Sequence, residues 1–132
     1  MMAALPTGGE MQPRILVADD DPIILRLLEV NLGLEGFAVE TALRGEDAVA
    51  RARETHPDLI ILDVMMPGMT GHDVAGQLKG DPTTADIPIV FLSARTQEED
   101  RARGRALGVA AYITKPFDPG ELVDIVRRLA TA

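Results

Sequence analysis

The sequence predicts an α/β fold built on a five-stranded parallel sheet with helices on both faces. Short runs of branched aliphatic residues alternate with longer stretches in which apolar residues recur at helical spacing. Most of the short runs are continuously apolar, which is typical of strands buried on both faces. Five strand–helix repeats joined by right-handed crossovers form a doubly wound sheet within one domain.

The strands are predicted where apolar runs end at turn residues. The second run differs from the others because it alternates apolar and polar residues, which favours a strand at the edge of the sheet. The expected strands cover residues 15–18, 37–41, 59–62, 87–92 and 111–113.

The first and last helices carry clear start signals. Asp21 and Asp118 are predicted N-caps, and each is followed by a proline in the first helical turn. Glu121 adds a capping-box variant at the last helix. Helices over 45–54, 71–79 and 97–107 are expected from weaker patterns. The predicted core-facing residues are Ile24, Leu27, Leu28 and Leu32 in the first helix, and Leu122, Ile125, Val126 and Leu129 in the last.

Composition excludes several classes of protein. The 132 residues include 13 basic and 21 acidic ones, giving a formal net charge of −8, which disfavours direct binding to nucleic acid or to an anionic membrane. No cysteine is present, so disulfides and thiolate chemistry are excluded. Neither a membrane-spanning helix nor a signal peptide is expected, and the predicted location is cytoplasmic. Residues 1–13 are predicted to be a flexible tail before a domain over 14–132, with Met11 as an alternative start.

Charged and hydroxyl side chains follow the central strands. Asp19 and Asp20 come after the first run, Asp63 after the third, Ser93 after the fourth and Lys115 shortly after the fifth. Each has an ordinary structural explanation when taken alone, such as a turn or a surface residue. Because ligands bind beyond the carboxyl ends of the strands in open α/β sheets, their coincidence at one edge favours a functional site.

These residue types suit phosphoryl transfer. Clustered carboxylates repel one another unless a cation joins them, and an all-oxygen site without histidine or cysteine suits Mg²⁺. Such a site would allow the Asp63 carboxylate to attack a phosphoryl group and form an acyl phosphate. Lys115 and Mg²⁺ would neutralise the phosphoryl oxygens, and the Ser93 hydroxyl would donate a hydrogen bond to one of them.

The chain resembles the receiver domain of two-component response regulators. The resemblance covers about residues 14–130 and rests on four motifs in order: ILVADDDP at 15–22, LIILDVMMPGMTG at 59–71, IPIVFLSA at 87–94 and YITKPF at 112–117. It implies a flavodoxin-like fold with strand order 2-1-3-4-5. A receiver is a signalling switch that assists its own phosphorylation and dephosphorylation, and not an enzyme acting on an external metabolite.

The resemblance also implies a role for each site residue. Asp63 matches the phosphoacceptor, and Asp19, Asp20 and the backbone carbonyl of Met65 match the remaining Mg²⁺ ligands. Lys115 matches the phosphate-binding lysine, whose bond to the following proline is expected to be cis. Ser93 matches the switch hydroxyl. Tyr112 matches the switch aromatic, which turns inward on phosphorylation.

Partners follow from the same resemblance. The phosphoryl donor would be a histidine kinase or a histidine phosphotransfer protein. Phosphorylation would re-present the face formed by the fourth helix, the fifth strand and the last helix to a downstream effector protein or domain. A phosphorylation-dependent dimer through that face is left open. Gly104, within the fourth helix, is compatible both with a marginally stable switch helix and with close packing.

Three alternatives share parts of the pattern. A flavodoxin-like cofactor binder needs a phosphate-binding loop where this chain has Asp19, Asp20 and Asp21. A phosphohydrolase of the haloacid dehalogenase type places its nucleophile after the first strand and adds a cap. A receiver that acts without phosphorylation is disfavoured by the complete set of site residues. The isolated histidines, His56 and His72, are interpreted as surface residues.

Overall fold

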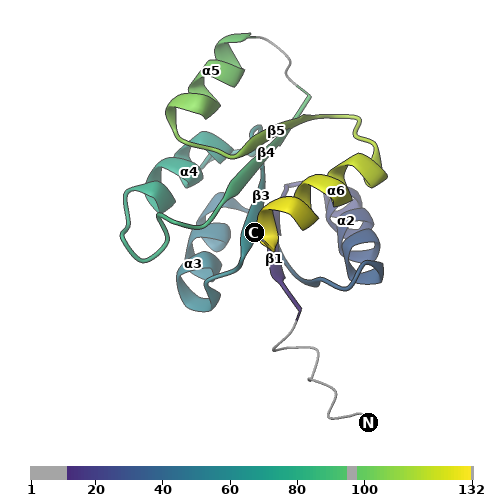
Figure 1. The fold of residues 1–132 in the computed structure, drawn as a ribbon. Coiled ribbons are helices and arrows are strands. Elements are labelled where there is room, and N and C mark those ends of the chain that lie inside the picture. Colours follow the sequence, from purple (N-terminus) through teal and green to yellow (C-terminus); the bar gives the residue numbers. More distant parts are fainter. Residues whose placement is uncertain (1–11, 95–97, 132) are drawn as a thin grey trace.

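The computed structural model describes residues 12–94 and 98–131. In order along the chain these form β1 (Arg14–Ala18), α2 (Pro22–Leu34), β2 (Ala38–Ala42), α3 (Gly45–Thr55), β3 (Leu59–Asp63), α4 (Gly71–Lys79), β4 (Ile89–Ser93), α5 (Glu98–Ala106), β5 (Ala111–Thr114) and α6 (Pro119–Ala130). The strands pair in parallel in the order β2-β1-β3-β4-β5 (Figure 1). The predicted fold and strand order are thereby confirmed.

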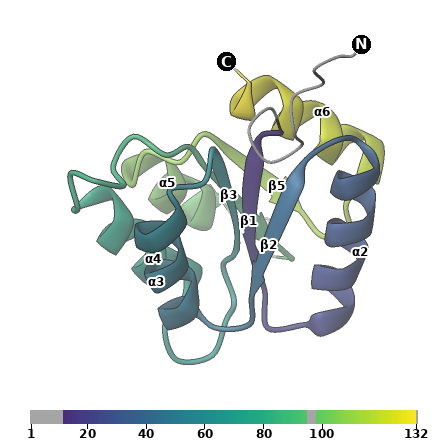
Figure 2. The ribbon, with the colours of Figure 1, turned by 90° about the horizontal axis from the view of Figure 1, so that it is seen from below.

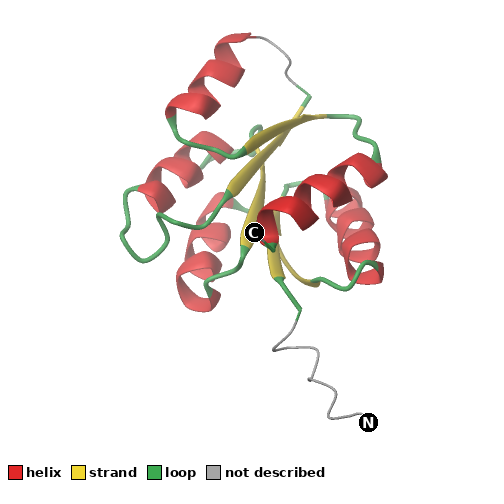
Figure 3. Cartoon of the chain, in the orientation of Figure 1, coloured by secondary structure: helices red, strands yellow, loops and turns green. Residues whose placement is uncertain are grey.

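The helices cover both faces of the sheet. α2 and α6 lie on one face, and α3, α4 and α5 lie on the other (Figure 2). The strands therefore form a central layer between two layers of helices (Figure 3). Neighbouring residues of β3 alternate between the two cores: Leu59 and Ile61 pack with α2 and α6, whereas Ile60 and Leu62 pack with α3 and α4. Burial on both faces explains why the central strands are continuously apolar.

Two strands begin later than expected. β2 starts at Ala38, because Phe37 precedes the ladder and its buried ring lies beneath the guanidinium of Arg127, 5.6 Å from the ring centroid. β4 starts at Ile89 and not at residue 87. Pro88 has no N–H to give to the ladder, and the Ile87 N–H donates to the carbonyl of Thr84.

The predicted core face of α2 is partly wrong. Leu28 and Leu32 are buried as expected, but the third buried position is Leu25, whereas Leu27 is 42% exposed. Ile24 is only partly buried against the core. Apolar residues occupy nearly every position of this helix, so spacing alone does not define which face turns inward.

The helix starts agree more closely with expectation. The side chains of Asp21 and Asp118 cap α2 and α6, accepting hydrogen bonds from the N–H groups of Ile23 and Gly120. In α6, Leu122 and Val126 are buried, and Ile125 and Leu129 pack partly against the same core. α4 begins with a capping box between Thr70 and Asp73, and these hydrogen bonds lower the pKa of Asp73.

Gly104 serves close packing. A Cβ at this position would lie 3.2 Å from Cγ2 of Val109 and 3.3 Å from Cδ2 of Phe91, so α5 approaches the sheet more closely than a larger residue would allow. This contact favours the packing explanation over that of a marginally stable helix.

A charged side chain lies in the middle of the edge strand β2. Glu40 is half-buried and lies between Arg14, at 3.7 Å, and Arg51, at 3.6 Å. Of the predicted tail at 1–13, residues 1–11 lie outside the described residues, and the carbonyl of Pro13 accepts a hydrogen bond from the N–H of Ala38. Among the helices described, none is long and apolar enough to cross a membrane.

Candidate acidic site at the carboxyl edge of the sheet

Three carboxylates converge where β1 and β3 end. These strands are neighbours with Ala18 opposite Leu62, so the residues that follow, Asp19 and Asp63, come together. Asp19 and Asp63 are buried and Asp20 is exposed. One oxygen of each of the three carboxylates lies within 4.8 Å of the others. The cluster therefore has two members held inside the fold and one facing solvent.

Lys115 reaches this cluster from the other end of the sequence. Its ammonium lies 2.9 Å from Oδ2 of Asp19 and 3.5 Å from Oδ1 of Asp63. The Lys115 N–H donates to the carbonyl of Ser93 at 2.8 Å, which fixes the lysine backbone beside the end of β4. The expected cis bond between Lys115 and Pro116 is present. Ser93 is fully buried, at the same edge.

Burial and charge shift the pKa of two groups in the site. Desolvation, together with the charge of Asp19, raises the pKa of Asp63 from 3.8 to about 6, although the Met65 N–H and Lys115 favour the ionised form. At Lys115, burial works against the charged form. The hydrogen bond that Lys115 donates to Asp19 and the charges of both carboxylates outweigh that effect and raise the lysine pKa. The site consequently holds one cation beside an Asp63 carboxyl group that resists ionisation.

The donor set fits a small hard cation. The three carboxylates supply oxygen ligands, which suit Mg²⁺. Asp19 and Asp63 are also held in place by backbone groups. Oδ1 of Asp19 accepts from the Asp21 N–H at 2.9 Å, and Oδ1 of Asp63 accepts from the Met65 N–H at 3.2 Å.

Tyr112, the predicted switch aromatic, lies on β5. Tyr112 is half-buried and packs edge-on against Phe91, with ring centroids 6.2 Å apart. Arg101 of α5 covers the tyrosine from outside, with its guanidinium 5.1 Å from the ring centroid, and donates to Oγ1 of Thr114 at 3.3 Å. The sequence carries no signal for this role of Arg101, because its partners lie on another element.

The expectation for His72 is wrong. His72 is buried in the first turn of α4, with its ring 5.1 Å from that of Phe91 in an edge arrangement, so the imidazole is a core residue. A lone histidine next to a helix start carries no sequence signal for this burial, which depends on how α4 packs on β4. His56 is exposed, as expected, at the end of α3.

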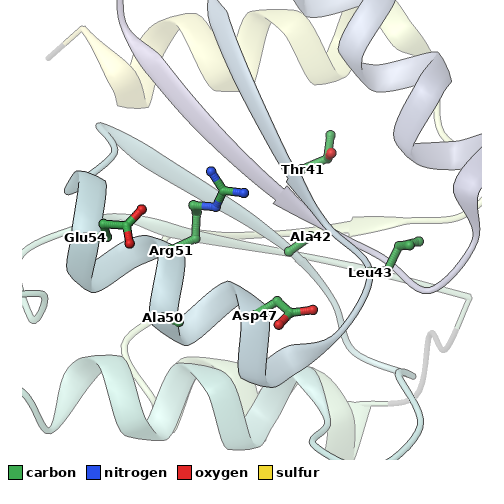
Figure 4. A pocket seen from close by; sticks show the side chains of 7 residues that line it. All are labelled: Thr41, Ala42, Leu43, Asp47, Ala50, Arg51 and Glu54. Atoms are coloured by element: carbon green, nitrogen blue, oxygen red, sulfur yellow. The ribbon is translucent and has the colours of Figure 1, made fainter.

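A surface groove of about 460 Å³ lies between the end of β2 and α3 (Figure 4). The described residues that line it do not include the site carboxylates, so the groove is a separate feature. They are Thr41, Ala42, Leu43, Asp47, Ala50, Arg51 and Glu54.

The fold and the site define a doubly wound α/β protein with an acidic cluster at the carboxyl ends of its strands. The family model of the response regulator receiver domain matches residues 15–127. The chain belongs to this family, the receiver domains of two-component systems, which are signalling switches.

Individual relatives agree with this assignment. The chain is 43% identical over 119 residues to the phosphate regulon transcriptional regulatory protein PhoB of Rhizobium meliloti, covering 90% of this chain and 52% of that protein. Vibrio cholerae chemotaxis protein CheY4 superposes with a TM-score of 0.85 at 32% identity, covering 89% of this chain and 98% of that one. The chain spans about half the length of the first curated relatives that it matches.

One solved relative contains a metal ion. The receiver domain of sensor histidine kinase PA1611 from Pseudomonas aeruginosa has a magnesium ion coordinated in its active-site cleft. It superposes with a TM-score of 0.84 at 26% identity, covering 92% of this chain and 99% of that one. Magnesium binding is thus known for a protein that shares this fold and family.

Proposed function

We propose that this domain, residues 14–132, accepts a phosphoryl group on Asp63 from a histidine kinase or a histidine phosphotransfer protein. The observation that carries the proposal is the position of the Asp63 carboxylate, which is buried at a strand end between Asp19 and the Lys115 ammonium. A carboxylate there can act as a nucleophile toward phosphorus. The phosphorus–nitrogen bond of the donor breaks as the new phosphorus–oxygen bond forms.

Mg²⁺ is the proposed cofactor, held by Asp19, Asp20, Asp63 and the backbone carbonyl of Met65. The three clustered carboxylates support this set, and the magnesium ion in the related receiver domain of PA1611 supports the choice of metal. When bound, Mg²⁺ supplies positive charge that reduces repulsion between the carboxylates and the incoming phosphoryl group. Within the chain, Asp19 holds Lys115 by its hydrogen bond, which keeps the ammonium directed toward the acceptor.

Lys115 and Ser93 would bind the transferred group. The Lys115 ammonium is already 3.5 Å from Asp63, so it can pair with a phosphoryl oxygen there after a small movement. Ser93 ends the strand next to Asp63, and its hydroxyl would donate a hydrogen bond to another oxygen. The same residues would assist loss of the phosphoryl group to water, so the domain promotes its own reactions without acting on a metabolite.

An apolar stripe on α2 supports a helical protein as the phosphoryl donor. Ile23, Leu27, Val30 and Leu34 are all at least 42% exposed and are spaced four, three and four residues apart. This spacing suits packing against another helix. Ile23 lies three residues after Asp20, so a helix on the stripe would extend to the acidic site. The partner we infer is a helical bundle that carries the phosphohistidine.

The output surface is proposed to be the face made by α5, β5 and α6. Tyr112 lies between Phe91 in the core and Arg101 at the surface, a position from which a change at Ser93 could alter the exposed face. An effector protein or domain would read this change, and a phosphorylation-dependent dimer is a second outcome of the same switch. Direct binding to nucleic acid, binding to a membrane and a location other than the cytoplasm are not expected for this acidic domain.

The proposal is tested by incubation with acetyl phosphate, followed by intact-protein mass measurement with Mg²⁺ and with EDTA. We expect one phosphoryl adduct that requires Mg²⁺ and is lost in Asp63→Asn. Asp47→Asn removes an exposed carboxylate on α3 and is expected to retain the adduct. A wild-type protein that stays unmodified while folded, or an adduct that persists in Asp63→Asn, would contradict the proposal.

A further inference from the structure

Gly71 lies unusually close to the backbone of the acceptor aspartate. It is the first residue of α4, and a Cβ built on it would lie 2.6 Å from the carbonyl oxygen of Asp63 and 2.8 Å from Cα of Val64. Cβ atoms do not approach other atoms so closely without a shift, and both neighbours here are backbone atoms. Only glycine lets α4 rest on this peptide.

The contact closes a short loop around the site. The Gly71 N–H donates to the carbonyl of Val64 at 3.1 Å. Residues 64–70 therefore form a loop that leaves the end of β3 and returns to it. Met65 lies inside this loop, and its N–H donates to Oδ1 of Asp63 at 3.2 Å. The loop therefore both orients the Asp63 side chain and places the Met65 backbone.

A second glycine lies in close contact with the other end of the loop. Gly45, the first residue of α3, is buried, and a Cβ there would lie 2.7 Å from the carbonyl oxygen of Met69. The loop is thus held between the starts of two helices, at Met69 by α3 and at Val64 by α4. Thr70 fixes the second of these helix starts through its capping box with Asp73.

We propose that Gly71 is a positioning residue for the acceptor site, with Gly45 as its second support. The close contact of α4 with the Asp63–Val64 peptide sets where the Asp63 carboxylate and the Met65 carbonyl lie. A methyl group at position 71 would push this peptide away from its place between Asp19 and Lys115. This inference rests on the proposed phosphoacceptor function and adds a determinant outside the set of charged residues.

The test compares four glycine-to-alanine variants with the wild type at a temperature where circular dichroism shows all to be folded. The added methyl group of Gly71→Ala or Gly45→Ala would lie too close to backbone atoms at one end of the loop. Gly76→Ala lies in the same helix as Gly71, with no atom within 4 Å of its Cβ. Gly104→Ala adds a tight contact elsewhere, against the side chains of Val109 and Phe91. The readouts are Mg²⁺ affinity by titration calorimetry without any phosphodonor and the rate of modification by acetyl phosphate at saturating Mg²⁺.

Gly71→Ala is expected to slow modification by about tenfold or more and to weaken Mg²⁺ binding severalfold, because small displacements of a reacting group are costly. Gly45→Ala should show a smaller loss of the same kind, and Gly76→Ala none. If Gly71→Ala does not fold, Gly45→Ala carries the test against the same controls.

Two results would overturn the inference. One is a Gly71→Ala protein that matches the wild type in both readouts. The other is a Gly104→Ala protein that loses as much of both as Gly71→Ala, which would assign the effect to general destabilisation. A wild-type protein that forms no adduct would instead contradict the proposed function. In that case the difference in Mg²⁺ affinity between Gly71→Ala and the wild type would still test the role of Gly71.

Discussion

Lys115 and Asp19 form a partly buried ion pair between residues 96 positions apart in the sequence, with Nζ and Oδ2 separated by 2.9 Å. The pair joins the first strand of the sheet to the loop that follows the last. It also explains why Asp19 can be fully buried, since a charged carboxylate without a partner would be very costly there. The acidic site therefore links the end of β1 to the segment that follows β5.

Loss of this lysine is expected to destabilise the protein. In Lys115→Met the stem is retained, but Asp19 and Asp63 lose their cation, and the unfolding free energy at pH 7 should fall by about 1–3 kcal/mol. The loss should shrink at pH 4, below the Asp63 pKa of about 6, because this carboxyl group has then taken up a proton. Urea unfolding at both pH values measures this. Lys79→Met, which removes an ammonium that donates to the carbonyls of Ala85 and Ile87, should lack the pH dependence.

Asp63 is expected to lower the stability of the metal-free protein at neutral pH. Its pKa is about 6 when folded against 3.8 ordinarily, so between these values the folded state holds a proton that the unfolded state has released. Stability should therefore fall as pH rises through this window. Asp63→Asn removes the effect and should stabilise the protein by about 3 kcal/mol above pH 6.

Thermal unfolding in EDTA at pH 4 and pH 7.5 tests this expectation. The stabilisation of Asp63→Asn should be present at the higher pH and nearly absent at the lower. Adding Mg²⁺ should raise the midpoint of the wild type more than that of the variant. An equal midpoint for both proteins at pH 7.5 in EDTA would show that burial does not penalise the Asp63 carboxylate.

Arg101 is expected to restrain Tyr112. Tyr112 is the single tyrosine in a chain without tryptophan, so intrinsic fluorescence reports on it directly. Arg101→Ala removes the guanidinium over the ring and should increase quenching by acrylamide, with a stability loss of about 0.5–1 kcal/mol. Arg103→Ala, an exposed neighbour on α5, is the matched control. Equal quenching in both variants would exclude the restraint.

A charge in the α2 stripe is expected to affect phosphoryl transfer from a protein donor but not from acetyl phosphate. Leu27→Lys places a charge on an exposed apolar position, so it should slow transfer from a helical phosphohistidine protein at least tenfold while leaving modification by acetyl phosphate unchanged. Ala50→Lys on α3 adds the same charge on the other face of the sheet. If both variants accept phosphate from the protein donor as the wild type does, α2 is not the docking surface.

The positions of the site residues were easier to predict from the sequence than the buried faces of the helices. Asp63 and Ser93 end buried strands, so sequence position alone brings them to one edge, and Lys115 follows the fifth strand closely. Leu27 and Leu25 could not be ranked, since α2 is apolar on most sides. The burial of His72 and the contact of Gly71 with Asp63 depend on how α4 sits on the sheet, which no local pattern encodes.

Glu40 has a consequence for how this molecule behaves in a crowded solution. A strand at the border of a sheet offers unpaired amide and carbonyl groups to any other chain, which is a common start of aggregation. In β2 that border carries a half-buried carboxylate flanked by Arg14 and Arg51. A foreign strand laid along β2 would have to desolvate these charges. We therefore expect the domain to stay dispersed at high concentration despite its open edge.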